Sequence, residues 1–528
     1  MEKIENISFQ DIGSIPQLIK DFLNKKLKDF NNFVFDENLV KSKTGNKQKF
    51  FTSEKREILS KVLHKQLSYL QISESQEFNL NSILSENTFT VTTGHQLNLF
   101  TGPVFFIYKI LQTIKLAEVL NENHPESHFV PIFWMATEDH DFDEINHFRT
   151  ENDFFEIKEK SGGAVGKIEV EDAFFISQFA EDFKDSVFGT ELILIMKNAY
   201  RKGNTLAEAT RILVHELFSE YGLLIIDGDE YELKNQMKTV FKNELLNEML
   251  FNSTKSKVDF LKSEYGKVQV NPREINLFYL SETRNRIDKS GDRYHIVDTD
   301  KSFSEKEILS ELENSPEKFS PNAVLRPAFQ ESVLPNIAYI GGNAEIMYWL
   351  ELPDYFSEAG IPFPFLVPRN SMLMISEKNF TKIQKSGLDF KDFLQDFATL
   401  SKDFLLDKNE ILESIQQKEE MLKNQFSELR LNAELTDKTF GNLVAAEETR
   451  QLKSFDKMRK RLLRAEKIKQ KEKLERLENL FLEIHPRGIW QERVYNFSVF
   501  YSDNGKKWLQ NCYVEMSAAN SELIVFKL

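Results

Sequence analysis

Five short apolar runs alternate with helical patterns over the first two-thirds of the chain. The runs lie at about 89–92, 130–136, 222–226, 338–342 and 365–367, and the clearest helical patterns lie at about 103–120, 205–220 and 344–358. Val130–Ala136 is almost continuously apolar, as expected for a parallel strand covered on both faces. Strands that alternate with helices predict an α/β fold with a doubly wound parallel sheet.

Two intervals interrupt this rhythm, at about 142–201 and 251–322, where the pattern is polar with short alternating pieces such as Lys267–Val270. We interpret both as inserted lobes. Right-handed crossovers place the carboxyl ends of all five strands on one edge of the sheet, which is where such sheets bind ligands. The lobes are therefore expected near the ligand edge of a core that spans 1–381.

A long, highly charged helical pattern fills 382–484. Apolar residues recur there at spacings of three, four or seven, at Ile411, Ile415, Leu422, Phe426 and Leu429, then at Leu474, Leu477, Phe481 and Ile484. This stripe is typical of a helical hairpin or coiled coil, with a turn at 432–439. A homodimer or an intramolecular hairpin would bury the same surface. The tail, 485–528, is predicted to fold back on the core.

Composition limits the class of protein. The 528 residues carry a formal charge of −15, and 41% are hydrophobic. The acidic charge argues against nucleic acid or an anionic membrane as a partner. The single cysteine, Cys512, excludes an internal disulfide, and no apolar run approaches membrane-spanning length. We therefore expect a cytoplasmic protein.

The first candidate for ligand binding follows the run at 89–92. Gly94, His95 and Gln96 would lie at a strand's carboxyl end, and Thr101 and Gly102 precede a helix that starts near Pro103. Free N–H groups at a helix start stabilise a phosphate or a carboxylate. A histidine at such a turn is also compatible with a purely structural role.

The second candidate follows the run at 130–136. Five carboxylates and two histidines lie between Glu138 and His147, including Asp139, His140 and Asp141. Acid/base chemistry, recognition of an amine, or Mg²⁺ binding would fit this cluster, as would a solvated acidic helix start. A structural zinc site does not fit, because the one cysteine is distant and the histidines lack a finger spacing.

Several separated motifs in this order resemble the bacillithiol biosynthesis cysteine-adding enzyme family. They are Thr93–Gln96, Phe100–Pro103, Trp134–Asp141, Leu325–Pro327, Tyr339–Gly342 with Glu345, Val367–Ser371 and Gln491–Val494. The resemblance covers nearly the whole chain. It implies a Rossmann-like core with inserted connecting-peptide lobes and a C-terminal α-helical coiled-coil domain that promotes dimerisation.

The resemblance further implies a cysteine ligase that joins L-cysteine to the amine of glucosaminyl-malate, the last step in making the low-molecular-weight thiol bacillithiol. Forming an amide from a free carboxylate is uphill in water, so an activated donor is expected. ATP, with or without Mg²⁺, is the activator that chemistry favours, and no metal site is assigned.

Roles are assigned to two groups of residues. The catalytic group, which would orient the amine and accept its proton, is Glu138, Asp139, His140 and Asp141. The group expected to bind substrate or phosphate is Gly94, His95, Gln96, Thr101, Gly102, Asp227, Arg326, Gly341, Gly342, Glu345, Arg369 and Ser371. Arginine suits the malate carboxylates because it pairs with them bidentately.

Two other functions stay open. One is a nucleotidyl transferase or synthetase that acts on another amino acid or amino sugar. The other is a dimeric, non-catalytic sensor of a nucleotide or thiol. The dense carboxylates after residue 137 speak against the sensor, because burying unpaired carboxylates is costly.

Overall fold

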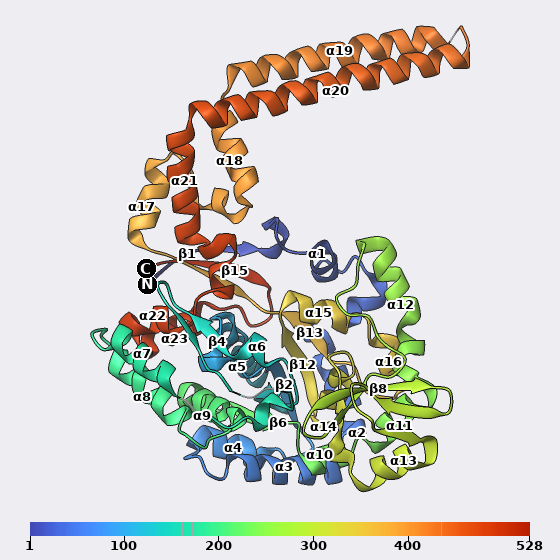
Figure 1. The fold of residues 1–528 in the computed structure, drawn as a ribbon, viewed down its shortest axis with the longest axis vertical. Helices are drawn as coiled ribbons and strands as arrows, with labels where there is room; N and C mark the ends of the chain where they lie inside the picture. Colours follow the sequence, from blue (N-terminus) through green and yellow to red (C-terminus); the bar gives the residue numbers. More distant parts are fainter. Residues whose placement is uncertain (160–161, 172, 435) are drawn as a thin grey trace. The chain divides into compact units, whose positions relative to one another are not determined.

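A computed structural model describes residues 1–159, 162–171, 173–434 and 436–528. The chain divides into two compact units (Figure 1). The first comprises Met1–Asp11, Ile15–Met374 and Gln491–Leu528, and the second comprises Ile12–Ser14 and Ile375–Trp490. The second unit thus begins and ends a few residues away from the predicted 382 and 484.

A parallel five-stranded sheet is the centre of the first unit, with strand order β13-β12-β2-β3-β6. Its strands are β13 (Phe365–Pro368), β12 (Asn336–Gly341), β2 (Thr88–His95), β3 (His128–Met135) and β6 (Leu224–Asp227). These are the five predicted strands, so the predicted α/β fold with a parallel sheet is confirmed. The apolar side chains on both faces of this sheet are buried, as the continuous apolar runs indicated.

Helices connect and cover these strands. Their bounds are α1 (Gln17–Leu23), α2 (Val40–Phe50), α3 (Ser53–Leu67), α4 (Glu74–Ser82), α5 (Phe105–Asn123), α9 (Leu206–Phe218), α10 (Tyr231–Asn235), α11 (Lys238–Asn247), α14 (Arg326–Val333), α15 (Asn343–Trp349) and α16 (Pro353–Glu358). The helix predicted at 344–358 is in fact two, because Pro353 has no N–H to continue the first. Leu116, Ala117 and Leu120 of α5 pack against Phe89 and Val91 of β2 in the core.

A second sheet lies within the interval 251–322. It is antiparallel, with order β10-β9-β8-β7-β11. Its strands are β7 (Leu277–Leu280), β8 (Arg284–Ser290), β9 (Arg293–Ile296), β10 (Ser302–Ser304) and β11 (Phe319–Pro321), with α12 (Met249–Tyr265) and α13 (Glu305–Asn314) beside them. We call this segment the antiparallel lobe. The alternating piece Lys267–Val270 forms no strand.

The interval 142–201 contains a two-stranded ribbon and short helices. These are α6 (Phe142–Ile145), β4 (His147–Arg149), β5 (Phe154–Glu156), α7 (Phe174–Phe183) and α8 (Gly189–Ala199). The chain's last segment contains α22 (Ser498–Asn504), α23 (Lys506–Glu515) and β15 (Glu522–Lys527). Strand β15 lies between β1 (Glu2–Ser8) and β14 (Ser371–Ile375), so the two ends of the chain meet in one sheet.

The second unit is helical, as predicted. It contains α17 (Glu377–Lys385), α18 (Phe397–Leu406), α19 (Glu410–Glu434), α20 (Lys438–Lys469) and α21 (Lys471–Ile484). Helices α19 and α20 pack side by side as a hairpin (Figure 1), with ion pairs Glu419–Arg459 and Arg430–Glu448 between them. The predicted turn at 432–439 includes residue 435, which is outside the described residues.

The apolar stripe of α19 differs in part from the prediction. Ile415, Leu422 and Phe426 are partly buried against the hairpin, as predicted. Ile411 and Leu429 are not buried within the hairpin, since 58% and 47% of their surface is exposed, and Leu412 rather than Ile411 is partly buried at the start of the stripe. The homodimer stays a prediction.

In the described part of the chain, no helix is both long and apolar enough to cross a membrane.

Candidate functional site

A cavity of about 540 Å³ lies at the carboxyl edge of the parallel sheet. The ends of β2 and β3, the start of α14, strand β12 and helix α15 supply one side, and β7 and β8 of the antiparallel lobe supply another. The location is the one expected for ligands in open α/β sheets. It is also where the sequence pattern placed the ligand edge.

The cavity brings together half of the predicted site residues. Those that line it are Gly94, His95, Gln96, Glu138, Asp139, His140, Arg326 and Glu345. Those that do not line it are Thr101, Gly102, Asp141, Asp227, Gly341, Gly342, Arg369 and Ser371. The two strand ends identified from the sequence therefore meet at one site.

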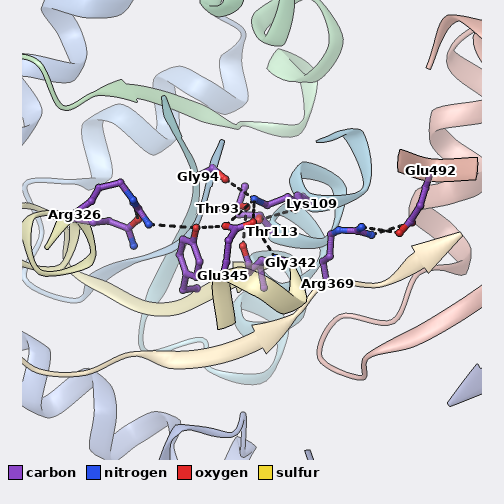
Figure 2. A network of polar contacts seen from close by, with 12 residues as sticks. Thr93, Gly94, Lys109, Thr113, Arg326, Gly342, Glu345, Arg369 and Glu492 are labelled. Atoms are coloured by element: carbon purple, nitrogen blue, oxygen red, sulfur yellow. Dashed lines mark hydrogen bonds and ion pairs between the residues drawn. The ribbon is translucent and has the colours of Figure 1, made fainter. Parts of the chain in front are cut away.

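Lys109 and Glu345 form an ion pair beneath the end of β2 (Figure 2). The Lys109 side chain is 1% exposed, and its Nζ donates to Glu345 Oε1 at 2.7 Å and to the Gly94 carbonyl at 2.5 Å. Glu345 also accepts hydrogen bonds from the Tyr339 hydroxyl at 2.6 Å and from the Gly342 N–H at 3.1 Å. Burial favours the neutral acid, but Lys109 outweighs it and the pKa of Glu345 is lowered. This network fixes the turn that carries Gly94.

His95 is neutral at physiological pH. Burial, and then repulsion from Lys109, lower the pKa of His95 to about 3. Its ring packs near Phe105 and Phe106, and no hydrogen-bond partner for its buried Nε2 is found in the described part of the chain. His95 therefore brings no positive charge with which to hold a phosphate.

Arg326 is a cation of the cavity wall that lies close to Gly94. A side chain at Gly94 would place its Cβ 3.6 Å from Arg326 Nη1 and 3.5 Å from the Tyr339 hydroxyl, so glycine leaves this approach open. Arg326 donates to Gln330 Oε1 at 2.9 Å. Although burial opposes its charge, the nearby Tyr339 and Tyr348 raise the pKa of Arg326. The guanidinium is thus a permanent cation in the cavity wall.

The acidic residues after β3 have separate environments. Glu138 pairs with the buried Lys234 at 2.6 Å, and Lys234 also pairs with Asp229 at 2.7 Å. Asp139 accepts from Gln96 Nε2 at 2.8 Å and from the His140 N–H at 2.7 Å. Burial would raise the pKa of Asp139, but these hydrogen bonds and Arg284 reverse the effect and lower it. Asp139 is therefore ionised. Among the described carboxylates that line the cavity, Glu138 and Glu345 each pair with a lysine, whereas Asp139 pairs with neither a lysine nor an arginine.

The tautomer of His140 follows from its neighbour in the antiparallel lobe. Arg284 Nη1 lies 3.1 Å from His140 Nδ1, and the same guanidinium donates to Ser320 Oγ and to the Pro321 carbonyl. Arginine can only donate, so Nδ1 accepts and the ring proton is on Nε2. In this arrangement His140 is a hydrogen-bond donor rather than a base.

The amino end of α5 does not fit the predicted phosphate. The Val104 N–H donates to the Tyr495 carbonyl at 2.8 Å, and Asn496 Nδ2 donates to the carbonyls of Phe100 and Gly102. Gly102, at φ +60°, packs against the Asn98 side chain. A segment distant in the sequence thus covers this helix end, which is why Thr101 and Gly102 do not line the cavity.

Asp227 lies behind Thr137, whose hydroxyl donates to its carboxylate. Its Oδ1 accepts from the Asp229 N–H at 2.9 Å, and Arg211 is 3.9 Å from Oδ2. Burial raises the pKa of Asp227 from 3.8 to about 6, despite Arg211. The fold therefore favours the neutral acid.

We expect Asp227 to make the protein less stable as pH rises. Its contribution is fully present below the ordinary pKa of 3.8 and is lost as pH rises through about 6. Relative to Asp227→Asn, which does not titrate, the wild type should lose up to roughly 3 kcal/mol between about pH 4 and pH 8. Urea unfolding of both proteins across this range measures the difference, and a constant difference would show that folding does not raise the pKa of Asp227.

Arg369 and Ser371 bind another residue of the chain instead of lining the cavity. Arg369 makes a bidentate pair with Glu492, at 2.7 and 3.0 Å, with side chains 5% and 4% exposed (Figure 2). Ser371 Oγ donates to the same carboxylate at 3.1 Å. This ion pair joins the end of β13 to the Gln491–Leu528 segment.

The remaining predicted residues have local structural contacts. Asp141 caps α6, accepting from the Glu144 N–H at 3.2 Å. Gly341 accepts from the Arg369 N–H at 2.8 Å, and Gly342 begins α15 and donates to Glu345.

Sequence reasoning assigned no site role to Lys109, Lys234, Arg284 or Tyr339, although Tyr339 lies in one of the motifs that carry the resemblance. Lys109 carries a signal, since it is a charge within the apolar stretch Phe105–Leu111. Such a lysine is rarely buried unless it is paired. Lys234 and Arg284 lie in polar surroundings that do not set them apart, and Tyr339 is one aromatic residue in an apolar strand. Over the described residues, no group of three or more His, Cys, Asp or Glu side chains is arranged to hold a metal ion.

Comparison with known proteins assigns the family. Residues 2–370 match the family described as bacillithiol biosynthesis BshC, N-terminal Rossmann-like domain, and residues 372–528 match its C-terminal coiled-coil domain. A Flavobacterium johnsoniae protein named "Putative cysteine ligase BshC" is 41% identical over 506 residues, covering 95% of each chain. One of the same name from Christiangramia forsetii is 37% identical, covering 98% of this chain and 97% of its own.

A solved structure described as a putative arginyl-tRNA synthetase from Campylobacter jejuni covers 89% of this chain and 99% of its own, at 8% identity. Its TM-score of 0.22 is too low to carry an argument about the fold. The two family matches together span nearly every residue, including the predicted Rossmann-like and coiled-coil parts. The chain therefore belongs to the BshC family of bacillithiol biosynthesis proteins.

Proposed function

We propose that this protein is a cysteine ligase that joins the carboxyl group of L-cysteine to the amine of glucosaminyl-malate, giving bacillithiol. The names of its relatives support the cysteine ligase class. The observation that supports the specific substrates is the cavity, where the ionised carboxylate of Asp139 and four arginines line one space. Two of these arginines, Arg284 and Arg326, are held in place by hydrogen bonds to the protein. An acceptor with both an amine and carboxylates complements that set of charges.

In this proposal Asp139 binds the amine of the acceptor. Its carboxylate is held by Gln96 and by the His140 N–H, which fix its orientation without neutralising it. The amine nitrogen attacks the activated acyl carbon of cysteine, the C–N bond forms, and the bond to the leaving group breaks. The nitrogen becomes strongly acidic once it has attacked, so even a carboxylate of low pKa can take its proton.

Arg326 and Arg284 would bind the acceptor's carboxylates or the oxygen of the leaving group. Both are already held in position, Arg326 by Gln330 and Arg284 by Ser320 and Pro321. Little side-chain freedom is lost when a ligand binds to arginines that are fixed in this way. His140, with a proton on Nε2, would add a hydrogen-bond donor to the same ligand.

The proposal that ATP activates the carboxyl group of cysteine rests on chemical reasoning alone. An amide does not form spontaneously from a free carboxylate and an amine in water, so we propose ATP as the activator. The amino end of α5 does not fit a phosphate, since Tyr495 and Asn496 cover it. We therefore assign no residue to ATP, and no step of the mechanism depends on where it binds.

Replacing Arg326 by Gln should raise the KM for glucosaminyl-malate about 10- to 100-fold, because a hydrogen bond to a charged group is worth about 1.5–3 kcal/mol. The KM for cysteine should change much less. Initial rates with each substrate varied in turn measure both constants. Equal increases for the two substrates would remove Arg326 from acceptor binding.

Reconstitution tests the proposed function. The purified protein is incubated with cysteine, glucosaminyl-malate and ATP, with each omitted in turn, and bacillithiol, AMP and ADP are measured by mass spectrometry. Product that requires all three supports the ligase. Release of AMP or ADP that depends on another amino acid would favour a different synthetase. Tight binding of glucosaminyl-malate without turnover would favour a sensor.

A further inference from the structure

A second cavity, of about 340 Å³, lies at the opposite edge of the parallel sheet, where β12 and β13 begin. One face of α2 lines it with Ser42, Lys43, Asn46 and Lys47. Phe33 of the short helix at Lys28–Phe33 and Phe363, just before β13, complete its apolar wall. None of the residues proposed for catalysis lines this cavity.

Lys43 presents an ammonium group with only a partial set of partners. Its Nζ donates to the Phe363 carbonyl at 2.7 Å, and it lies 5.1 and 5.0 Å from the ring centres of Phe33 and Phe365. No carboxylate pairs with Lys43 in the described part of the chain. An ammonium group has three donors, so Lys43 can donate to a ligand as well.

The surroundings of Lys43 have an excess of positive charge. Lys47 is 2% exposed and pairs with Glu331 at 2.9 Å. The other Glu331 oxygen accepts from Gln330 and from Asn336, so three hydrogen bonds already hold that carboxylate. Burial, and then repulsion from Lys47, lower the pKa of Lys43 to about 8, and the same two causes lower the pKa of Lys55 to about 8.

Lys43 lines the cavity, and its described partners are a carbonyl and two aromatic rings rather than a carboxylate, so its ammonium group is well placed to bind an anion. Removing an ammonium group from water is costly unless an opposite charge replaces the lost hydration. The amides of Asn32 and Asn46 and the hydroxyl of Ser42 line the same cavity and supply neutral donors. Leu39, Ile337 and the two phenylalanines supply an apolar surface of the kind that holds a ligand's hydrocarbon part.

We propose that this cavity binds a small carboxylate that has an apolar body, with its carboxylate on Lys43 and its body between Phe33 and Phe363. The site is separate from the cavity at the carboxyl edge of the sheet. The proposal does not depend on the ligase reaction and goes beyond it.

Isothermal titration calorimetry of the full chain with phenylacetate tests this site, with phenylacetamide as the uncharged probe of matched shape. We expect saturable 1:1 binding of phenylacetate and at least tenfold weaker binding of phenylacetamide, because only the former pairs with the ammonium. Lys43→Met should weaken phenylacetate binding at least tenfold, and Lys43→Arg should retain most of it.

Lys49→Met is the matched control, since Lys49 is exposed on the same helix and does not line the cavity. Thermal melting shows whether each variant is folded. If Lys43→Met does not fold, Lys43→Arg still tests the site. The proposal is overturned if the wild type shows no saturable binding of phenylacetate, if phenylacetamide binds equally well, or if Lys49→Met weakens binding as much as Lys43→Met.

Discussion

Replacing Asp139 by Asn lowers bacillithiol formation by about 10²- to 10⁴-fold in our account, the range that a general base contributes. Asn keeps the shape of the side chain and can still accept from the His140 N–H, which lies 2.7 Å from Asp139 Oδ1. Gln96 would lose its contact with residue 139 but keep the hydrogen bond that its Nε2 donates to Glu144 at 2.9 Å. Fold and melting temperature should therefore stay close to those of the wild type while turnover is lost. Initial rates and thermal melting measure the two effects.

Asp141→Asn is the control for this prediction. Asp141 is two residues away, but it caps α6 and does not line the cavity. Its replacement should leave the rate within a few-fold of wild type, because asparagine also caps helices well. Full activity in Asp139→Asn, or equal losses in both variants, would contradict the role given to Asp139.

Replacing Glu492 by Gln should destabilise the protein by about 3–5 kcal/mol, because removal of one partner leaves a buried charge without compensation. Both side chains of the Arg369–Glu492 pair are almost fully buried, at 5% and 4% exposed. The activity of the molecules that remain folded should persist, since neither residue lines the cavity. Urea unfolding, and rates measured well below the melting temperature, separate the two effects.

Glu515→Gln provides the comparison for an exposed pair. Lys3 and Glu515 lie 2.6 Å apart, with side chains 37% and 33% exposed. Exposed pairs contribute about 0–1 kcal/mol, so this change should have little effect. If Glu492→Gln were equally mild, or if it abolished the activity of a stable protein, Arg369 would have to be considered part of the active site again.

The parallel sheet could be predicted because its strands are buried on both faces. Runs such as Val130–Ala136 are apolar throughout, and a continuous apolar run of this length is typical of a buried parallel strand. Short polar strands carry no such signal. The antiparallel lobe contains β8, which begins with Arg284 and is mostly polar, whereas the alternating Lys267–Val270 forms no strand. Pairing with distant segments, rather than the local sequence pattern, determines whether these segments form strands.

The candidate site was predictable where it depends on strand ends. Parallel strands end on one edge, so Gly94–Gln96 and Glu138–His140 had to lie near each other. Segments that are distant in the sequence determine which residues cover a helix end and which residues pair with a buried charge. Asn496 covers the start of α5, and Glu492 binds Arg369 across more than a hundred residues of sequence. No local pattern marks either contact.

Thiol profiling by mass spectrometry tests the central claim most directly, in cells that lack this gene and carry either the wild-type chain or Asp139→Asn. We predict that the deletion strain lacks bacillithiol and accumulates glucosaminyl-malate. The wild-type chain should restore bacillithiol, and Asp139→Asn, at equal protein level, should not. An unchanged thiol profile on deletion, or restoration by Asp139→Asn, would contradict the account of a cysteine ligase that acts through this cavity.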